Sequence, residues 1–120
     1  MILADTSVWI SHLRNDLPTL RKRLVDGLVL CHPFILGELA CGHLHNRLEI
    51  LSLLRALPQA TPADHEEVLR FIHERRLTGK GLGWIDAHLL ASAVLSRVPL
   101  WTLDRTLAKA AKDLHLSYSH

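Results

Sequence analysis

Residues 1–10 read MILADTSVWI, and this stretch decides the fold class. The apolar run at 2–5, ILAD, predicts a short buried β-strand that ends in an aspartate. Residues 6–15 have helical periodicity and begin with Thr6 and Ser7, which favour helix N-termini. A strand that passes directly into a helix is typical of α/β proteins. Asp5, at the junction, is open to two interpretations: it caps the helix, or it is a functional carboxylate.

The alternation of strand and helix continues through the chain. Short apolar runs at 28–31 and 99–103 predict two further strands, and the stretch LSY at 116–118 predicts a terminal edge strand. Helices are predicted at 17–27, once or twice within 33–57, and at 62–77, 84–97 and 104–114. This order predicts an α/β fold, a three-layer sandwich with a short, mainly parallel central sheet.

Length and composition argue against a disordered, a membrane-spanning or a disulfide-rich protein. A length of 120 residues favours a single domain over 1–120, and 48% apolar residues argue against disorder. No apolar run reaches the roughly 18 residues of a membrane span, and no basic segment precedes the first apolar run. We therefore expect a soluble cytoplasmic protein. Two cysteines, Cys31 and Cys41, are too few for a disulfide framework and are expected to be buried thiols.

Two acidic residues follow predicted strands. Asp5 ends the first strand, and Asp104 comes directly after the strand at 99–103. The carboxyl ends of parallel strands meet at one edge of a sheet, where open α/β folds place their sites. We therefore expect these two carboxylates to lie at the same edge.

Two more acids lie on predicted helices among apolar neighbours. Glu38 shares a helix face with Phe34, Ile35 and Cys41. Asp86 shares a face with Leu89, Leu90 and Ala93. A carboxylate on an apolar face is costly unless a cation or several donors meet it.

Each acid has a structural interpretation of its own. Asp5 and Asp104 could be helix caps, and Glu38 could pair with an arginine. Asp86 could be an acid in the first turn of its helix, where the helix dipole stabilises a negative charge. One shared divalent cation explains all four together. Oxygen ligands favour Mg²⁺ or Mn²⁺ over zinc, with some acids acting through water. Thr102 lies on the same side of its strand as Asp104 and could orient a water molecule, or could simply be a β-branched strand residue.

Four stretches together resemble the PIN domain, and more narrowly the VapC toxins of bacterial type II toxin–antitoxin pairs. They are DTSVWI at 5–10, ILGELACG at 35–42, GKGLGWIDAHLLASA at 79–93 and LWTLDRTLAKAA at 100–111. The resemblance implies an acidic quartet of Asp5, Glu38, Asp86 and Asp104, with Thr102 as the accompanying hydroxyl. It further implies a metal-dependent endoribonuclease that binds RNA, is held inactive by a VapB-type antitoxin and forms a homodimer.

The sequence gives less support to other kinds of functional site. Cys41, His43 and His45 suggest zinc, but residues two apart on a helix do not face each other. The loop TGKGLG at 78–83 lacks a phosphate-loop pattern, although Lys80 within it could meet a phosphate. A receiver-like signalling domain would need paired acids after its first strand and an aspartate in mid-chain. A catalytically inactive PIN-like binding module remains possible from sequence.

Charge and aromatic content say little about RNA binding. The formal net charge is only +2, and the clustered basic residues are compatible with solvated helix faces. Aromatic residues are scarce, so no stacking platform for single-stranded RNA is evident. Two apolar helical patterns could serve either the core or an antitoxin. They consist of Trp9, Ile10 and Leu13, and of Ile50, Leu53, Leu54 and Leu57.

Overall fold

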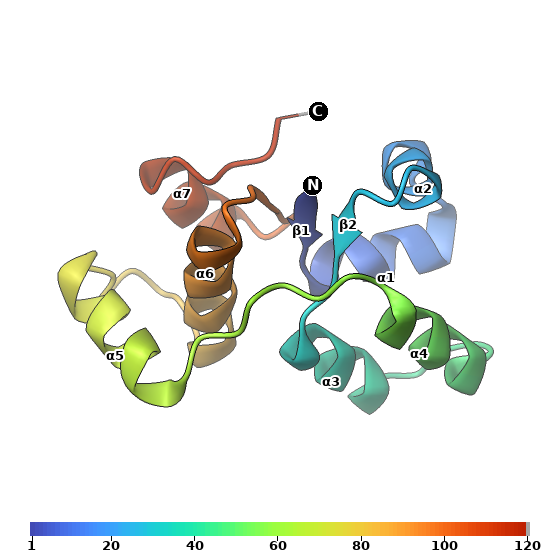
Figure 1. Ribbon diagram of the computed structural model, residues 1–120, viewed down its shortest axis with the longest axis horizontal. Helices are drawn as coiled ribbons and strands as arrows, with labels where there is room; N and C mark the ends of the chain where they lie inside the picture. The colour runs from blue at the N-terminus through green and yellow to red at the C-terminus, as the bar shows by residue number, and fades with distance from the viewer. Residues whose placement is uncertain (120) are drawn as a thin grey trace.

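The computed structural model describes residues 1–119 and has the predicted α/β architecture, with helices on both sides of a parallel sheet (Figure 1). The strands are β1 (Ile2–Ala4), β2 (Val29–Leu30) and β3 (Leu100–Trp101). The helices are α1 (Thr6–Asn15), α2 (Pro18–Val25), α3 (Pro33–Cys41), α4 (Arg47–Ala56), α5 (His65–Glu74), α6 (Trp84–Ser96) and α7 (Arg105–Asp113). Helices α1 to α4 lie on one side of the strands in Figure 1, and α5 to α7 lie on the other.

The sheet has the strand order β2-β1-β3, and both pairings are parallel. Strand β1 is central, and its three residues are buried, as expected of a strand with helices on both sides. Each edge is extended by an isolated parallel bridge: Cys31 pairs with Gln59, and Leu100 pairs with Ser117. The terminal strand predicted at 116–118 is therefore present as a single bridge.

The stretch 33–57 forms two helices, one of the two possibilities that the sequence left open. Helix α3 ends at Gly42, whose backbone N–H donates to the Leu39 carbonyl oxygen. Asn46 has a left-handed backbone with φ of 54° and begins α4. Asparagine tolerates this conformation better than most residues, so the chain reverses here.

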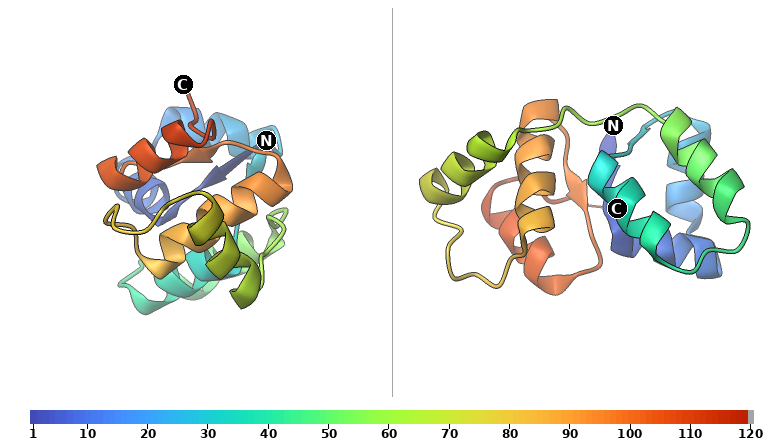
Figure 2. Two further views of the ribbon diagram at one scale, coloured as in Figure 1. Left: turned by 90° about the vertical axis from the view of Figure 1, so that its left-hand side faces the viewer. Right: turned by 90° about the horizontal axis from the view of Figure 1, so that it is seen from below.

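Helix α6 packs in the main core beside β3, and α5 adds a small second cluster on it. Helix α5 begins at His65 rather than at the predicted residue 62, because Asp64 forms a capping box with Glu67. It packs on α6 and lies at one end of the molecule in Figure 1 and in the right-hand view of Figure 2. Helix α6 is buried along most of its length, as predicted. Within residues 1–119, no helix combines the length and apolar character needed to cross a membrane.

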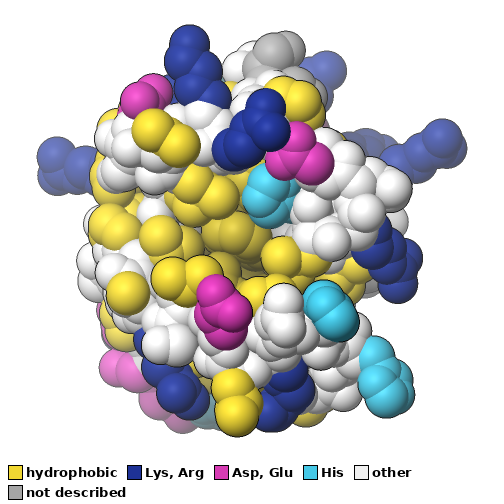
Figure 3. Space-filling view, turned by 90° about the vertical axis from the view of Figure 1, so that its right-hand side faces the viewer, with side chains coloured by type: hydrophobic (Ala, Val, Ile, Leu, Met, Phe, Trp, Pro, Cys, Tyr) yellow, Lys and Arg dark blue, Asp and Glu magenta, His cyan; other side chains and the backbone are white. Residues whose placement is uncertain are grey.

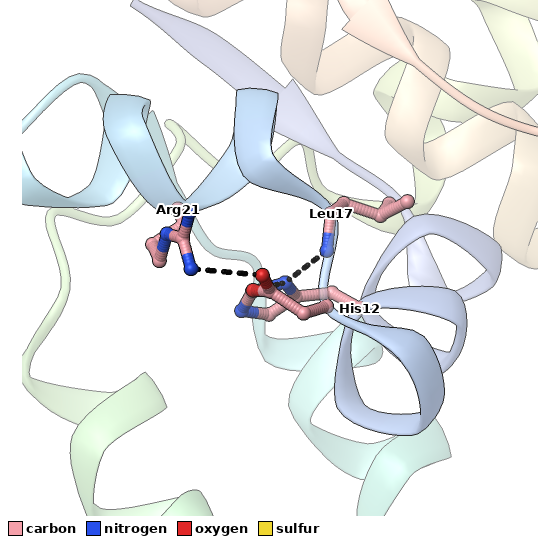
Figure 4. Close-up of polar contacts among 4 residues, drawn as sticks. His12, Leu17 and Arg21 are labelled. Carbon is pink, nitrogen blue, oxygen red and sulfur yellow. Dashed lines mark hydrogen bonds and ion pairs between the residues drawn. The ribbon is translucent and has the colours of Figure 1, made fainter.

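The junction between α1 and α2 is held by polar contacts (Figure 4). His12 Nδ1 accepts a hydrogen bond of 2.9 Å from the Leu17 backbone N–H. Asp16, which has φ of 48°, forms an ion pair of 2.9 Å with Arg21. The first bond satisfies the backbone N–H of Leu17 at the start of α2, and the exposed ion pair links the side chains of the turn and α2.

Candidate active site

Asp5 is the one buried carboxylate among the predicted site residues. It lies at the carboxyl end of β1 and is 6% exposed. Its Oδ1 accepts hydrogen bonds from the Ser7 hydroxyl at 2.5 Å and the Val8 backbone N–H at 3.3 Å. The bond from Val8 makes Asp5 the N-cap of α1, so the capping interpretation is confirmed.

The second oxygen of Asp5 links two strand ends. Asp5 Oδ2 accepts a hydrogen bond of 2.6 Å from the Thr102 hydroxyl, which follows β3. Thr102 Oγ1 in turn accepts a bond of 3.0 Å from the Asp104 backbone N–H. The structure therefore brings Asp5, Thr102 and Asp104 to one edge of the sheet, as predicted from parallel strands.

The burial of Asp5 has an electrostatic consequence. Desolvation raises the pKa of its carboxyl, while hydrogen bonds from Ser7, Thr102 and Val8 act in the opposite direction. Within residues 1–119, none of the four predicted acids takes part in an ion pair. The buried charge of Asp5 is thus met by hydroxyl and amide dipoles and not by a protein cation.

Glu38 reaches the same region from α3. Its Oε1 accepts a hydrogen bond of 2.6 Å from the hydroxyl of Thr6, the residue directly after Asp5. The alternative interpretation, that Glu38 pairs with an arginine, does not hold in residues 1–119, where Glu38 forms no ion pair. Helix α1 therefore connects Glu38 to the end of β1.

Asp104 and Asp86 have capping roles in the structure. Asp104 Oδ1 accepts a bond of 2.9 Å from the Leu107 backbone N–H and caps α7. Asp86 Oδ2 accepts a bond of 3.0 Å from the Gly83 backbone N–H at the start of α6. Neither side chain is hydrogen-bonded to another predicted acid in the described residues.

Glu38 lies at the exposed border of its apolar helix face. Glu38, Phe34 and Cys41 are exposed, whereas Ile35 on the same face is buried. Asp86 is half-buried and Asp104 is exposed. The energetic cost of an apolar setting therefore applies mainly to Asp5.

The described residues contain no group of three or more His, Cys, Asp or Glu side chains that is arranged to hold a metal ion. This holds both for the acidic quartet and for Cys41, His43 and His45, the weak zinc candidates. Cys41 is also exposed and not buried as expected, whereas Cys31 is buried. The metal-binding role of the quartet accordingly stays a prediction.

Comparison with known proteins decides the family. The PIN domain family matches residues 2–113 of this chain. The chain belongs to the PIN domain family. It is similar to Ribonuclease VapC32 from two strains of Mycobacterium tuberculosis, CDC 1551 / Oshkosh and ATCC 25618 / H37Rv. Each is 46% identical over 114 residues, which cover 94% of this chain and 92% of the relative. The predicted resemblance to VapC-type PIN domains is confirmed, and a receiver-like domain is excluded.

Two hydroxyls of this PIN domain were not predicted as site residues. Thr6 donates to Glu38, and Ser7 donates to Asp5 while accepting a bond of 2.9 Å from the Leu103 backbone N–H. Both were assigned only a helix-start role from the sequence. The signal was the adjacency of two hydroxyls to Asp5, but Glu38 and Leu103, their other partners, lie far away along the chain.

Two surface hollows of the PIN domain meet at Glu38, which lines both. The first has a volume of about 470 Å³ and lies among α1, α3 and α4, with mainly aliphatic walls. Its walls include Ile10, Leu13, Leu39, Leu44 and Ile50. The second, of about 430 Å³, lies between α3 and α6 and is bordered by Phe34 and Trp84.

The two apolar helical patterns, which could serve either the core or an antitoxin, are divided between core and surface. Trp9 and Leu54 are buried, whereas Leu13 and Leu53 are exposed by 37% and 62%. Figure 3 views the end of the molecule that carries α1 and α4 and shows hydrophobic side chains gathered around a hollow. One side of each helix therefore packs in the core, and the other leaves apolar surface beside the site.

Proposed function

We propose that this PIN domain is a metal-dependent endoribonuclease and the toxin of a VapBC-type pair. The observation that carries the proposal is the Asp5 carboxylate, which is buried at a strand end without a cationic partner in residues 1–119. The names of the relatives, which are ribonucleases, support the reaction class. The substrate is accordingly RNA, and the reaction is phosphodiester hydrolysis.

Asp5, Glu38, Asp86 and Asp104 are proposed to hold Mg²⁺ or Mn²⁺. Their donor chemistry fits, because all four offer carboxylate oxygens, the ligands that hard divalent cations prefer. Capping occupies one oxygen of Asp86 and one of Asp104, so each has a second oxygen for a cation or its water ligands. When bound, the cation supplies positive charge against the scissile phosphate and activates water for attack.

The chain's own residues orient this site. The hydroxyls of Ser7 and Thr102 fix the two Asp5 oxygens, and Thr6 fixes one oxygen of Glu38. Thr102 also bonds the backbone of Asp104, so one hydroxyl couples both strand ends. We propose Thr102 as a positioning residue, whose loss reduces the rate less than the loss of Asp5.

The catalytic proposal is tested by comparing Asp5→Asn with Asp64→Asn. Both residues cap helices through one backbone N–H, but Asp64 starts α5 outside the proposed site. Purified proteins are incubated with RNA in Mn²⁺ or in EDTA. We expect wild type and Asp64→Asn to cleave RNA only with metal, and Asp5→Asn to lose several orders of magnitude in rate.

Two results would contradict the catalytic proposal. Equal cleavage by wild type and Asp5→Asn would place the activity elsewhere or in a contaminant. No cleavage by well-folded wild type in any divalent metal would favour the catalytically inactive PIN-like binding module. Sequencing of RNA ends formed on induction in cells would identify the RNA and the bond that are cut.

A VapB-type antitoxin is proposed to cover the aliphatic hollow. Leu13 is 37% exposed at its wall, and amphipathic segments bind in such grooves through apolar anchors. We expect expression of this chain to arrest bacterial growth and the small protein encoded beside it to restore growth. Leu13→Glu should weaken that complex, whereas Leu69→Glu on α5 should not, because exposed Leu69 lies outside this hollow.

The toxin assignment can fail while the nuclease assignment stands. Normal growth despite strong expression of soluble wild-type protein would argue against a toxin, since a housekeeping nuclease needs no antitoxin. The homodimer implied by the family resemblance is a separate proposal. Light scattering of the purified chain measures it directly, and a monomer mass at micromolar concentration would contradict it.

A further inference from the structure

The hollow between α3 and α6 is bordered by two exposed aromatic rings. Phe34 is 36% exposed and Trp84 is 38% exposed, although they are far apart in the sequence. The hollow has a volume of about 430 Å³ and is open to solvent. Glu38 is the charged residue among those that line it.

A buried histidine holds the two rings in place. His88 is 5% exposed and lies against both aromatic side chains. Its ring centroid is 4.6 Å from that of Phe34 and 4.6 Å from that of Trp84, both with edge-to-face geometry. His65 packs on Trp84 with a centroid distance of 4.9 Å. Rings fixed in this way lose little conformational entropy when a ligand stacks on them.

The two hollows that meet at Glu38 differ in chemistry. The hollow among α1, α3 and α4 has mainly aliphatic walls, which suit an apolar helix, whereas Phe34 and Trp84 offer flat π-faces. Gly37 at the second hollow leaves open space where a side chain would otherwise stand. Exposed Lys80 is a positively charged residue in the loop that precedes Trp84.

We propose that Phe34 and Trp84 form a subsite for one unpaired RNA base beside the scissile phosphate. The proposal rests on the proposed ribonuclease function, because continuity with Glu38 places the subsite next to the candidate active site. Unstacked bases in single-stranded RNA bind aromatic side chains by stacking, largely without regard to sequence. The subsite therefore favours single-stranded segments and positions the phosphate of the bound nucleotide.

The test measures binding and not cleavage. Wild type, Trp84→Leu, Trp84→Phe and Leu69→Ala are titrated in EDTA with a short oligoadenylate and with an abasic ribose-phosphate oligomer of equal length. We expect wild type, Trp84→Phe and Leu69→Ala to prefer the oligoadenylate by about tenfold, within the range that base–aromatic stacking contributes. Trp84→Leu should lose this preference and bind both oligomers equally. Leu69 is a matched control because its exposure of 44% is close to the 38% of Trp84 and it lines neither hollow.

Intrinsic fluorescence provides a second readout. Trp9 and Trp101 are 3% and 4% exposed, so Trp84 is the accessible indole of the three tryptophans. Oligoadenylate should quench wild-type fluorescence, and Trp84→Phe should abolish the quenching while keeping the affinity. Phe34→Leu should reduce the preference for oligoadenylate without removing the quenching.

The outcomes separate this inference from the proposed function. RNA cleavage by wild type without a preference for oligoadenylate over the abasic oligomer would overturn the subsite alone. The same preference in wild type and Trp84→Leu would also overturn it. Weaker antitoxin binding by Trp84→Leu, with unchanged oligoadenylate binding, would assign the surface to a protein and overturn the subsite. A tryptophan-dependent preference without RNA cleavage would support the subsite and contradict the nuclease proposal.

Discussion

His32 makes the stability of this PIN domain sensitive to pH. The side chain is 2% exposed and caps α3, where its Nδ1 accepts a hydrogen bond of 3.0 Å from the Phe34 backbone N–H. Its Nε2 lies 3.1 Å from the Ser92 hydroxyl. The bond from Phe34 requires an unprotonated Nδ1, so protonation would remove the cap and place a charge in the interior.

The magnitude follows from the pKa of His32. Burial, and to a lesser degree repulsion from His88, lowers this pKa from 6.5 to about 4 in the folded protein. Between these values the unfolded chain binds more protons, so the free energy of unfolding falls as the pH falls. Between pH 7.5 and pH 5, the titration of His32 alone should lower the free energy of unfolding by about 2 kcal/mol. Burial also lowers the pKa of His88, which acts in the same direction.

Urea unfolding of wild type and His32→Asn at both pH values tests this reasoning. Asparagine is a good N-cap and can accept the bond from Phe34, but it does not titrate. The raised pKa of Asp5 acts in the opposite direction, because protonation of the carboxyl at lower pH removes the desolvation cost of its charge and raises the free energy of unfolding. That contribution is common to both proteins and cancels. Wild type should lose about 2 kcal/mol more than His32→Asn between the two pH values. Equal losses would refute the assignment of a buried neutral histidine.

Three further perturbations separate the roles of the site and the scaffold. Thr102→Val should lower the free energy of unfolding by about 2 kcal/mol, because Asp5 loses a charge-assisted hydrogen bond, whereas Thr102→Ser should cost about 1 kcal/mol or less in the same urea titration. Millimolar Mn²⁺ should raise the Tm of wild type by several degrees in calorimetry, because a bound cation reduces the repulsion among the four carboxylates. The Tm of the Asp5→Asn, Asp86→Asn double variant should not change. An equal shift in both proteins would exclude the quartet as the metal site. Arg21→Ala should cost about 1 kcal/mol or less in urea unfolding, because its ion pair with Asp16 is exposed, and a larger loss would show that the α1–α2 junction is a critical contact.

The sheet was predictable because its strands are strongly apolar and flanked by helix signals. The runs around β1, β2 and β3 were all located from the sequence, and their parallel pairing followed from the helices between them. The break between α3 and α4 was left open, because the 33–57 stretch is apolar enough to form one helix. Its position depends on the left-handed backbone of Asn46, which is a local turn and not a change in periodicity.

The position of the candidate site was predictable, but its surroundings were not. Asp5 and Asp104 meet at one sheet edge because parallel strands bring their ends together. The exposure of Glu38 was missed because α3 is apolar on several faces, and sequence alone does not show which face meets the core. The aromatic hollow was missed for a related reason: Phe34 and Trp84 become neighbours of one histidine only in the folded chain.

Helix capping does not by itself account for the position of Asp5. Asp64 makes a full capping box at the start of α5 and remains exposed, so an acid can cap a helix here at no desolvation cost. Asp5 makes its cap while buried and receives two hydroxyl hydrogen bonds in addition. Burial of a carboxylate is unfavourable, and a fold that needed only a cap would leave it at the surface. The proposed cation site at the sheet edge would account for this difference between Asp5 and Asp64, and the RNA-cleavage rates of the paired Asp5→Asn and Asp64→Asn variants test that proposal.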